Sequence, residues 1–159
     1  MILADPVALR AALPRNQRLL GLDVGEKTIG LALSDPALSV ASPIATIRRT
    51  KFTADATALL KLATERGVGG LVIGLPLNMD GSEGPRCQSV RQFASNLLKL
   101  KDLPVLFWDE RLSTMAVERE MIAHDVTRAR RDKVVDQAAA AFILQGLLDA
   151  LARSKTPSS

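Results

Sequence analysis

Two apolar runs with a very short connection constrain the fold of this chain more than any other feature. Residues 18–25 and 28–34 both have the pattern of β-strands, and only Glu26 and Lys27 separate them. This connection is too short for the crossover that parallel strands need, so the two strands are expected to pair antiparallel. Residues 40–49 are a third candidate strand, interrupted by Pro43. The N-terminal part of the chain therefore predicts three adjacent antiparallel strands.

The rest of the chain alternates between helical and strand patterns. Residues 70–75 form a continuous apolar run, which is typical of a central strand, and residues 104–108 are a fifth strand. Helices are expected at about 53–66, 86–100, 113–123 and 133–153. Strand-helix-strand units require parallel pairing with right-handed crossovers. We therefore expect an α/β fold with a five-stranded mixed sheet, partly antiparallel and partly parallel, flanked by helices.

Length and composition indicate one globular domain. The chain has 159 residues, of which 47% are hydrophobic and 24% are charged. Residues 1–17 are predicted to be an N-terminal extension with one or two helical turns, residues 18–153 the domain, and residues 154–159 a polar tail. No apolar run is long enough to span a membrane and the N-terminus lacks a signal-peptide pattern, so we expect a cytoplasmic protein.

The rare residue types exclude several classes of site. A single cysteine, Cys87, excludes an internal disulfide and a cysteine-rich zinc site, and a single histidine, His124, argues against Ser-His-Asp or histidine-metal enzymes. Four Phe, one Trp and no Tyr argue against a base-stacking platform. The net charge of +4 suits a polyanionic partner, although a slightly basic soluble protein fits it equally well.

Acidic residues occur where the predicted strands would gather a ligand. Asp23 ends the first strand, Asp109 and Glu110 end the fifth, and Asp136 lies in the first turn of an almost wholly apolar last helix. Residues 109 and 110 point to opposite faces if both are still in the strand, so only one of them is expected at the site. Taken alone, Asp136 could simply interact with the helix dipole, which is worth about 0.3–1 kcal/mol.

Three converging carboxylates would suit a divalent metal. Mg²⁺ and Mn²⁺ take oxygen ligands, and water and phosphate complete their coordination, so few protein carboxylates suffice. Two such ions can clamp the attacking and leaving oxygens of a phosphodiester. This chemistry needs neither histidine nor cysteine, which agrees with a chain that has one of each. The sequence therefore predicts a Mg²⁺ or Mn²⁺ site that acts on phosphodiesters.

Four segments resemble, in order and spacing, the motifs of the YqgF/RuvX family. They are residues 21–35, 74–84, 109–114 and 133–145, within a match from about residue 18 to 150. The resemblance implies an RNase H-like fold related to Holliday-junction resolvases of the RuvC type. It also implies that Asp23, Glu110 and Asp136 are the catalytic, metal-binding acids, with Glu110 preferred to Asp109. Two residues depart from the family pattern: Thr28 stands where many members have Arg, and Leu147 where an aromatic is common.

The function that the resemblance implies is endonuclease maturation of the 5′ end of pre-16S ribosomal RNA. Water would attack in line and leave a 5′-phosphate and a 3′-hydroxyl. One alternative is resolution of four-way DNA junctions, for which a homodimer would supply the two active sites that two symmetric cuts need. Another is a ribosome-assembly factor that binds nucleic acid with a vestigial site. A third is an actin-like or sugar-kinase ATPase, which shares an Asp-x-Gly phosphate loop but needs two such domains.

Polar and basic residues near the acids are candidates for binding nucleic acid. Lys27 follows the first strand, Asn78 lies in a turn-rich loop after the central strand, and Arg111 could bind phosphate or pair with Asp109. A basic cluster precedes Asp136, and each of its members could instead be a solvated surface charge: Arg128, Arg130, Arg131 and Lys133. Such contacts position a nucleic acid without reading its sequence. Arg48, Arg49 and Lys51 are a second candidate cluster.

Overall fold

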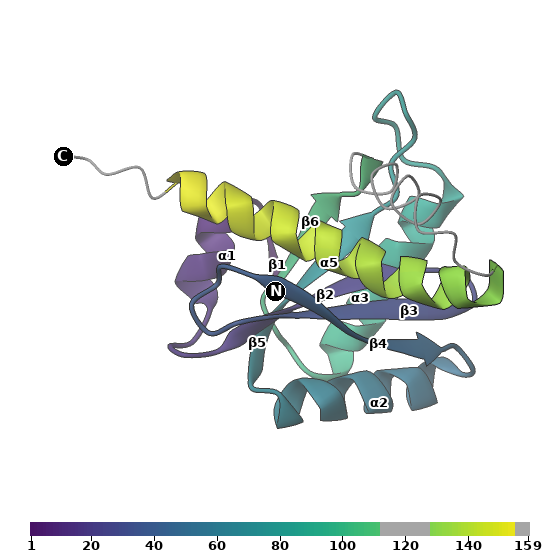
Figure 1. The fold of residues 1–159 in the computed structure, drawn as a ribbon, viewed down its shortest axis with the longest axis horizontal. Coiled ribbons are helices and arrows are strands. Elements are labelled where there is room, and N and C mark those ends of the chain that lie inside the picture. Colours follow the sequence, from purple (N-terminus) through teal and green to yellow (C-terminus); the bar gives the residue numbers. More distant parts are fainter. Residues whose placement is uncertain (112–127, 155–159) are drawn as a thin grey trace.

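A six-stranded sheet between two layers of helices forms the protein (Figure 1). The computed structural model describes residues 1–111 and 128–154, with side chains described for residues 1–111 and 137–154. Along the chain the elements are β1 (Ile2–Leu3), α1 (Pro6–Ala12), β2 (Arg18–Val24), β3 (Thr28–Ser34), β4 (Ala41–Arg48), α2 (Phe52–Glu65), β5 (Val68–Leu75), α3 (Pro85–Leu100), β6 (Val105–Asp109) and α5 (Arg128–Ser154).

The sheet has the mixed pairing that the sequence predicts. Its strand order is β1-β6-β5-β2-β3-β4. β2, β3 and β4 pair antiparallel, whereas β5 is parallel to both β2 and β6. The α/β class and the three-stranded antiparallel segment are thereby confirmed. Because β2, β5 and β6 run in the same direction, their carboxyl ends lie at one edge of the sheet.

The sheet has a sixth strand that the sequence analysis missed. Ile2 pairs with Val105 and Leu3 with Leu106, so β1 extends the sheet beyond β6. The N-terminal ammonium group forms an ion pair with Asp102 and donates to the Leu103 carbonyl at 3.0 Å. A two-residue strand has no recognisable period, which is why the pattern of apolar residues could not reveal it.

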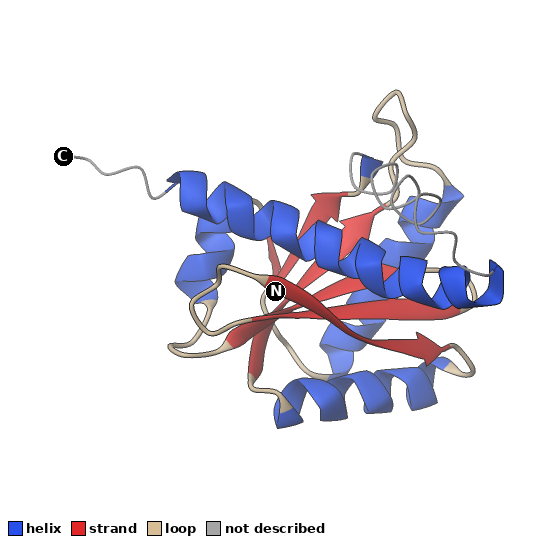
Figure 2. Ribbon diagram, in the orientation of Figure 1, coloured by secondary structure: helices blue, strands red, loops and turns tan. Residues whose placement is uncertain are grey.

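Each face of the sheet is covered by two helices (Figure 2). α2 and α3 pack on one face, with Leu20 and Leu22 of β2 in their apolar cluster. α1 and α5 cover the other face, with Leu19 of β2 in theirs. Side chains alternate between the faces of a strand, so Asp23 lies on the α5 face and Val24 on the α3 face. This alternation sets which residues can meet at the sheet edge.

Several details of the elements differ from the sequence prediction. α5 begins at Arg128 and not at 133, because Arg and Ala before Lys133 are good helix formers and extend the helix. Pro43 lies at a register shift between β3 and β4, so the strand continues past it. The predicted helix at 113–123 is outside the described residues. None of the helices in the described residues is long and apolar enough to cross a membrane.

Candidate active site

Asp23 lies near the carboxyl end of β2, on the face that α5 covers. It is half-buried, and its Cα pairs with that of Gly30 in β3. Two residues earlier, Gly21 touches α5 so closely that a Cβ there would come 2.8 Å from the Cβ of Leu144 and 2.9 Å from the Ala140 carbonyl oxygen. Glycine at this position lets helix and strand approach each other. Asp23 is thus held beside α5, at the edge of the sheet.

Glu110 follows β6 and turns its carboxylate over β5. Its backbone N–H donates to the Leu75 carbonyl at 3.3 Å, which continues the pairing of the two strands. A Cβ at Gly74 would lie 2.6 Å from Oε2 of Glu110 and 2.5 Å from Cδ1 of Ile143 in α5. The carboxylate therefore occupies space that exists because residue 74 has no side chain. Glu110 and α5 meet over β5, on the same face as Asp23.

The environment of Glu110 favours a cation beside it. Burial is the main cause that raises its pKa, and the neighbouring Asp109 charge raises it further, while the positive charge of Arg86 acts in the opposite direction. A carboxylate removed from water is costly in its ionised form, and a nearby positive charge relieves that cost. Oxygen ligands in such a place suit a hard divalent ion.

Asp136 lies in the N-terminal part of α5, one helical turn before Ala140. α5 starts beside the carboxyl edge of the parallel strands and runs toward the opposite edge (Figure 1), so its N-terminal turns, which include Asp136, lie toward the edge where β2 ends. Its side chain is outside the described part. Among the described side chains, no three acidic, histidine or cysteine residues form a metal-binding group.

Asp109 and Arg111 form a closed pair beside the site. Nε and Nη2 of Arg111 donate to Oδ2 of Asp109 at 2.8 and 2.6 Å, and the backbone N–H of Arg111 donates to Oδ1 at 3.0 Å. The hydrogen bonds from Arg111 lower the pKa of Asp109. Arg111 also donates to the Met79 carbonyl at 3.2 Å. Of the two roles the sequence left open for Arg111, the structure shows pairing, and phosphate binding stays a prediction.

Asn78 shapes the loop between β5 and α3, which projects from the body of the protein (Figure 1). Its N–H donates to the Ser82 carbonyl at 2.9 Å, and its Nδ2 to Ser82 Oγ at 3.0 Å. Asp80 accepts from the N–H and hydroxyl of Ser82 at 2.9 and 2.6 Å. The loop is therefore cross-linked internally, and it carries Met79, 80% exposed, beside Glu110. A nucleic-acid contact by Asn78 stays a prediction.

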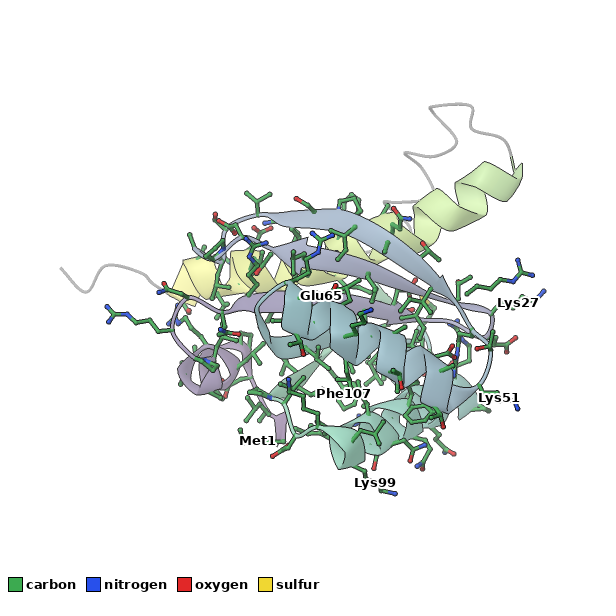
Figure 3. All side chains as sticks on the ribbon, turned by 90° about the horizontal axis from the view of Figure 1, so that it is seen from below. Met1, Lys27, Lys51, Glu65, Lys99 and Phe107 are labelled. Carbon is green, nitrogen blue, oxygen red and sulfur yellow. The ribbon has the colours of Figure 1, made fainter. Side chains whose placement is uncertain are left out.

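The other predicted basic contacts fall into three groups. Lys27 is exposed in the β2–β3 turn and extends into solvent (Figure 3). Arg49 is largely engaged within the protein, because it donates to the Gly25 carbonyl at 2.6 Å and lies 5.4 Å from the centre of the Phe93 ring. The basic cluster before Asp136 lies on the first turns of α5, and its side chains are outside the described part: Arg128, Arg130, Arg131 and Lys133.

Arg86 is the residue near the acids that sequence reasoning missed. It lies in the first turn of α3 and is exposed. It borders a cavity of about 400 Å³ that Glu110 and Met79 also line. It also lines a second cavity of about 230 Å³, between the end of β2 and the start of α3. A usable signal was present: a basic residue directly after Pro85, where a helix opens behind the loop that follows a central strand.

Comparisons with known proteins agree on family and fold. Residues 17–150 match the model of the RuvX family, described as Holliday junction resolvase. The chain is 62% identical over 156 residues to a protein of Rhodospirillum centenum, covering 95% of this chain and 83% of that protein. A protein of Paramagnetospirillum magneticum is 62% identical over 149 residues, covering 94% and 96% of the two chains. Both relatives are named, provisionally, as pre-16S rRNA nucleases.

Solved structures of Holliday-junction resolvases share the fold. RuvC of T. thermophilus in complex with a Holliday junction has a TM-score of 0.52 at 10% identity, covering 85% of this chain and 96% of that one. The yeast mitochondrial resolvase Ydc2 has a TM-score of 0.55 at 13% identity, covering 92% and 84%. The expected RNase H-like fold is thus confirmed. The family match favours a nuclease over the ATPase alternative.

Proposed function

Because this chain belongs to the RuvX family, we propose that it is a metal-dependent nuclease that processes the 5′ end of pre-16S ribosomal RNA. The reaction would be hydrolysis of a phosphodiester bond. The substrate is proposed from the relatives of about 60% identity, which are provisionally named as pre-16S rRNA nucleases.

One observation carries the proposal. Asp23 and Glu110 come from two strands of the parallel part of the sheet, yet both lie on the α5 face at the same edge. Close packing around Gly21 and Gly74 brings α5 down onto this edge. Asp136, one turn before Ala140, is the third acid in the proposal. Two of the three predicted acids are thus supported by described side chains, and the third by its helix.

The donor set suits Mg²⁺ or Mn²⁺. Carboxylate oxygens are the ligands these ions prefer, and burial of Glu110 makes a nearby cation favourable. When bound, divalent ions stabilise the negative charge on the attacking and leaving oxygens of the phosphodiester. In this proposal Asp23, Glu110 and Asp136 hold the ions. Ile143 of α5 and the carboxylate of Glu110 both lie over Gly74, and in this proposal that packing helps to hold the carboxylate in place.

The test is a side-by-side cleavage assay on pre-16S RNA and on a four-way DNA junction, with Mg²⁺ or Mn²⁺. Asp23→Asn should abolish cleavage and leave folding intact, since the substitution keeps the shape of the side chain. Asp149→Asn is the matched control, because Asp149 is an exposed acid near the other end of α5. Equal cleavage by the Asp23→Asn protein and the unaltered protein would remove Asp23 from the site.

Junction resolution is the second candidate, because the family model carries that description. It requires two active sites in one assembly, so it requires a homodimer at the assay concentration. If the protein has the mass of one chain in solution, cleaves the RNA efficiently and leaves the junctions intact, junction resolution is excluded and the ribosomal RNA function is supported. Salt-sensitive binding to both substrates without cleavage in either metal would instead support a non-catalytic assembly factor.

A further inference from the structure

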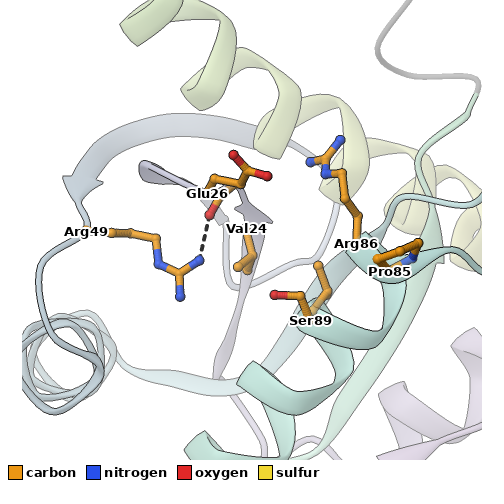
Figure 4. A pocket seen from close by; sticks show the side chains of 8 residues that line it. Val24, Glu26, Arg49, Pro85, Arg86 and Ser89 are labelled. Atoms are coloured by element: carbon orange, nitrogen blue, oxygen red, sulfur yellow. Dashed lines mark hydrogen bonds between the residues drawn. The ribbon is translucent and has the colours of Figure 1, made fainter.

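A second cavity, lined by both polar and apolar groups, lies across the sheet edge from the carboxylates. It has a volume of about 230 Å³ and lies between the end of β2 and the first turns of α3 (Figure 4). Its lining residues are Val24, Gly25, Glu26, Arg49, Pro85, Arg86, Ser89 and Val90. Building on the proposed function, we propose that this cavity binds a backbone phosphate adjoining the one that is cleaved, with Arg86 as its main contact.

The strand alternation explains how one substrate strand could reach both places. Asp23 lies on the α5 face of β2, whereas the next residue, Val24, lies on the α3 face and lines the cavity. A nucleic-acid strand that crosses the carboxyl edge of the sheet therefore passes from the carboxylates to the cavity within one residue of β2. Successive phosphates would meet the two faces of the same edge.

The cavity has a fixed guanidinium, that of Arg49, on one side. Arg49 donates to the Gly25 carbonyl at 2.6 Å, faces Asp55 at 4.0 Å and lies over the Phe93 ring, so its guanidinium is held before a ligand arrives. A group that is already ordered loses little conformational entropy on binding. Arg49 thus supplies a preorganised guanidinium to the wall of the cavity, with its charge partly balanced by Asp55 and much of its hydrogen-bonding capacity used within the protein.

Arg86 supplies the second charge and lies opposite Arg49 in the close-up view (Figure 4). No hydrogen bond or ion pair joins its guanidinium to another side chain in the described part of the chain. A guanidinium has five N–H donors and binds a phosphate with two parallel hydrogen bonds. The Ser89 hydroxyl, one helical turn further along α3, adds a neutral donor.

Two acids border this region and bear on its charge. Glu26 lines the cavity, but its carboxylate points away from the Arg49 guanidinium (Figure 4). Glu110 lies on the other side of Arg86, within range of its electrostatic field. Arg86 therefore stands between the carboxylate site and the cavity, where a phosphate contact would align the strand for cleavage.

The test measures binding separately from cleavage. A fluorescein-labelled RNA hairpin and a labelled four-way DNA junction are titrated with protein in EDTA over a range of salt concentrations, using Arg86→Gln. Lys99→Gln is the matched control, because it removes one positive charge from the exposed far end of α3 (Figure 3). The plot of log K against log salt has a negative slope, and loss of one phosphate contact should make that slope less steep by about 0.7–0.9. Affinity should fall about tenfold.

Arg86→Lys separates charge from geometry. It should keep the salt slope but lose part of the affinity, since an ammonium group cannot form the paired hydrogen bonds of a guanidinium. The proposal is overturned if Arg86→Gln and Lys99→Gln change the slope equally, or if the unaltered chain binds neither probe. Cleavage is measured in parallel. Binding that depends on Arg86 without any cleavage would refute the proposed nuclease and support the phosphate site. Cleavage and binding that are unchanged by Arg86→Gln would support the nuclease and refute the phosphate site.

Discussion

Gly74→Ala tests whether the position of the Glu110 carboxylate matters for cleavage. The added Cβ would lie 2.6 Å from Oε2 of Glu110 and 2.5 Å from Cδ1 of Ile143, closer than real Cβ contacts come. Both neighbours are the ends of flexible side chains, and the backbone at residue 74 is ordinary strand. The protein can therefore accept the substitution by moving these two groups, which displaces the carboxylate.

The expected stability change is small and the expected activity change is large. Overpacking a core typically costs 1–3 kcal/mol, and we expect about 1 kcal/mol here because only side-chain ends must move. A displacement of about 1 Å in a catalytic group can lower the rate about 100-fold. Gly74→Ala should therefore unfold in urea nearly like the unaltered protein, while cleavage in Mn²⁺ falls about 100-fold.

Gly70→Ala is the control from the same strand and the same face. Its Cβ would come 3.0 Å from Cδ2 of Leu19, at the end of β5 remote from Glu110. We expect this variant to lose stability and to keep its cleavage rate per folded molecule. Unchanged cleavage by Gly74→Ala would refute the reasoning about Glu110. Equal losses in both variants would mean that general distortion of β5, and not the carboxylate, sets the rate.

Three further predictions follow from the described contacts. Asp109→Asn should leave cleavage nearly unchanged, whereas Glu110→Gln should lower it about 100-fold or more; the reverse order in a cleavage assay would make Asp109 the ligand. Asp55→Ala should lower the urea-derived free energy of unfolding by about 1–3 kcal/mol, because Asp55 is buried and accepts from the Thr50 N–H at 3.1 Å; no change would contradict this. Hydrogen bonds, first that from the Val40 N–H, lower the pKa of Asp35 to about 2, below its unfolded value of 3.8. The ionised Asp35 carboxylate therefore stabilises the fold above about pH 4, and this effect is lost as the pH falls toward 2. The difference in thermal stability between Asp35→Asn and the unaltered protein should shrink over that range. A difference that stays constant would contradict the role of Asp35.

The local patterns predicted most of the fold. The β2–β3 hairpin followed from the short Glu26–Lys27 connection, and the central position of β5 from its continuous apolar run. The local patterns could not predict β1, because a strand of two residues has no recognisable periodicity and its position depends on the distant Asp102 and Leu103. Contacts far apart in the sequence decide such edge strands.

The candidate site was predictable in part. The alternation of a strand showed that Asp109 and Glu110 diverge, but it could not say which one faces α5; the close approach at Gly74 supplies that information. A glycine inside an apolar strand is a signal for such an approach. Arg86 was missed because a basic residue directly after Pro85 is a weak signal by itself, and its place beside Glu110 depends on how α3 packs against the sheet.

The central claim is that Asp23, Glu110 and Asp136 together bind divalent metal. Its most direct test is Mn²⁺ binding to the purified protein, measured by electron paramagnetic resonance of the free ion, without any nucleic acid. We predict that Asp23→Asn, Glu110→Gln and Asp136→Asn each weaken Mn²⁺ binding about tenfold or more, and that Asp149→Asn does not. Equal Mn²⁺ affinity in all four variants and the unaltered protein would contradict the claim.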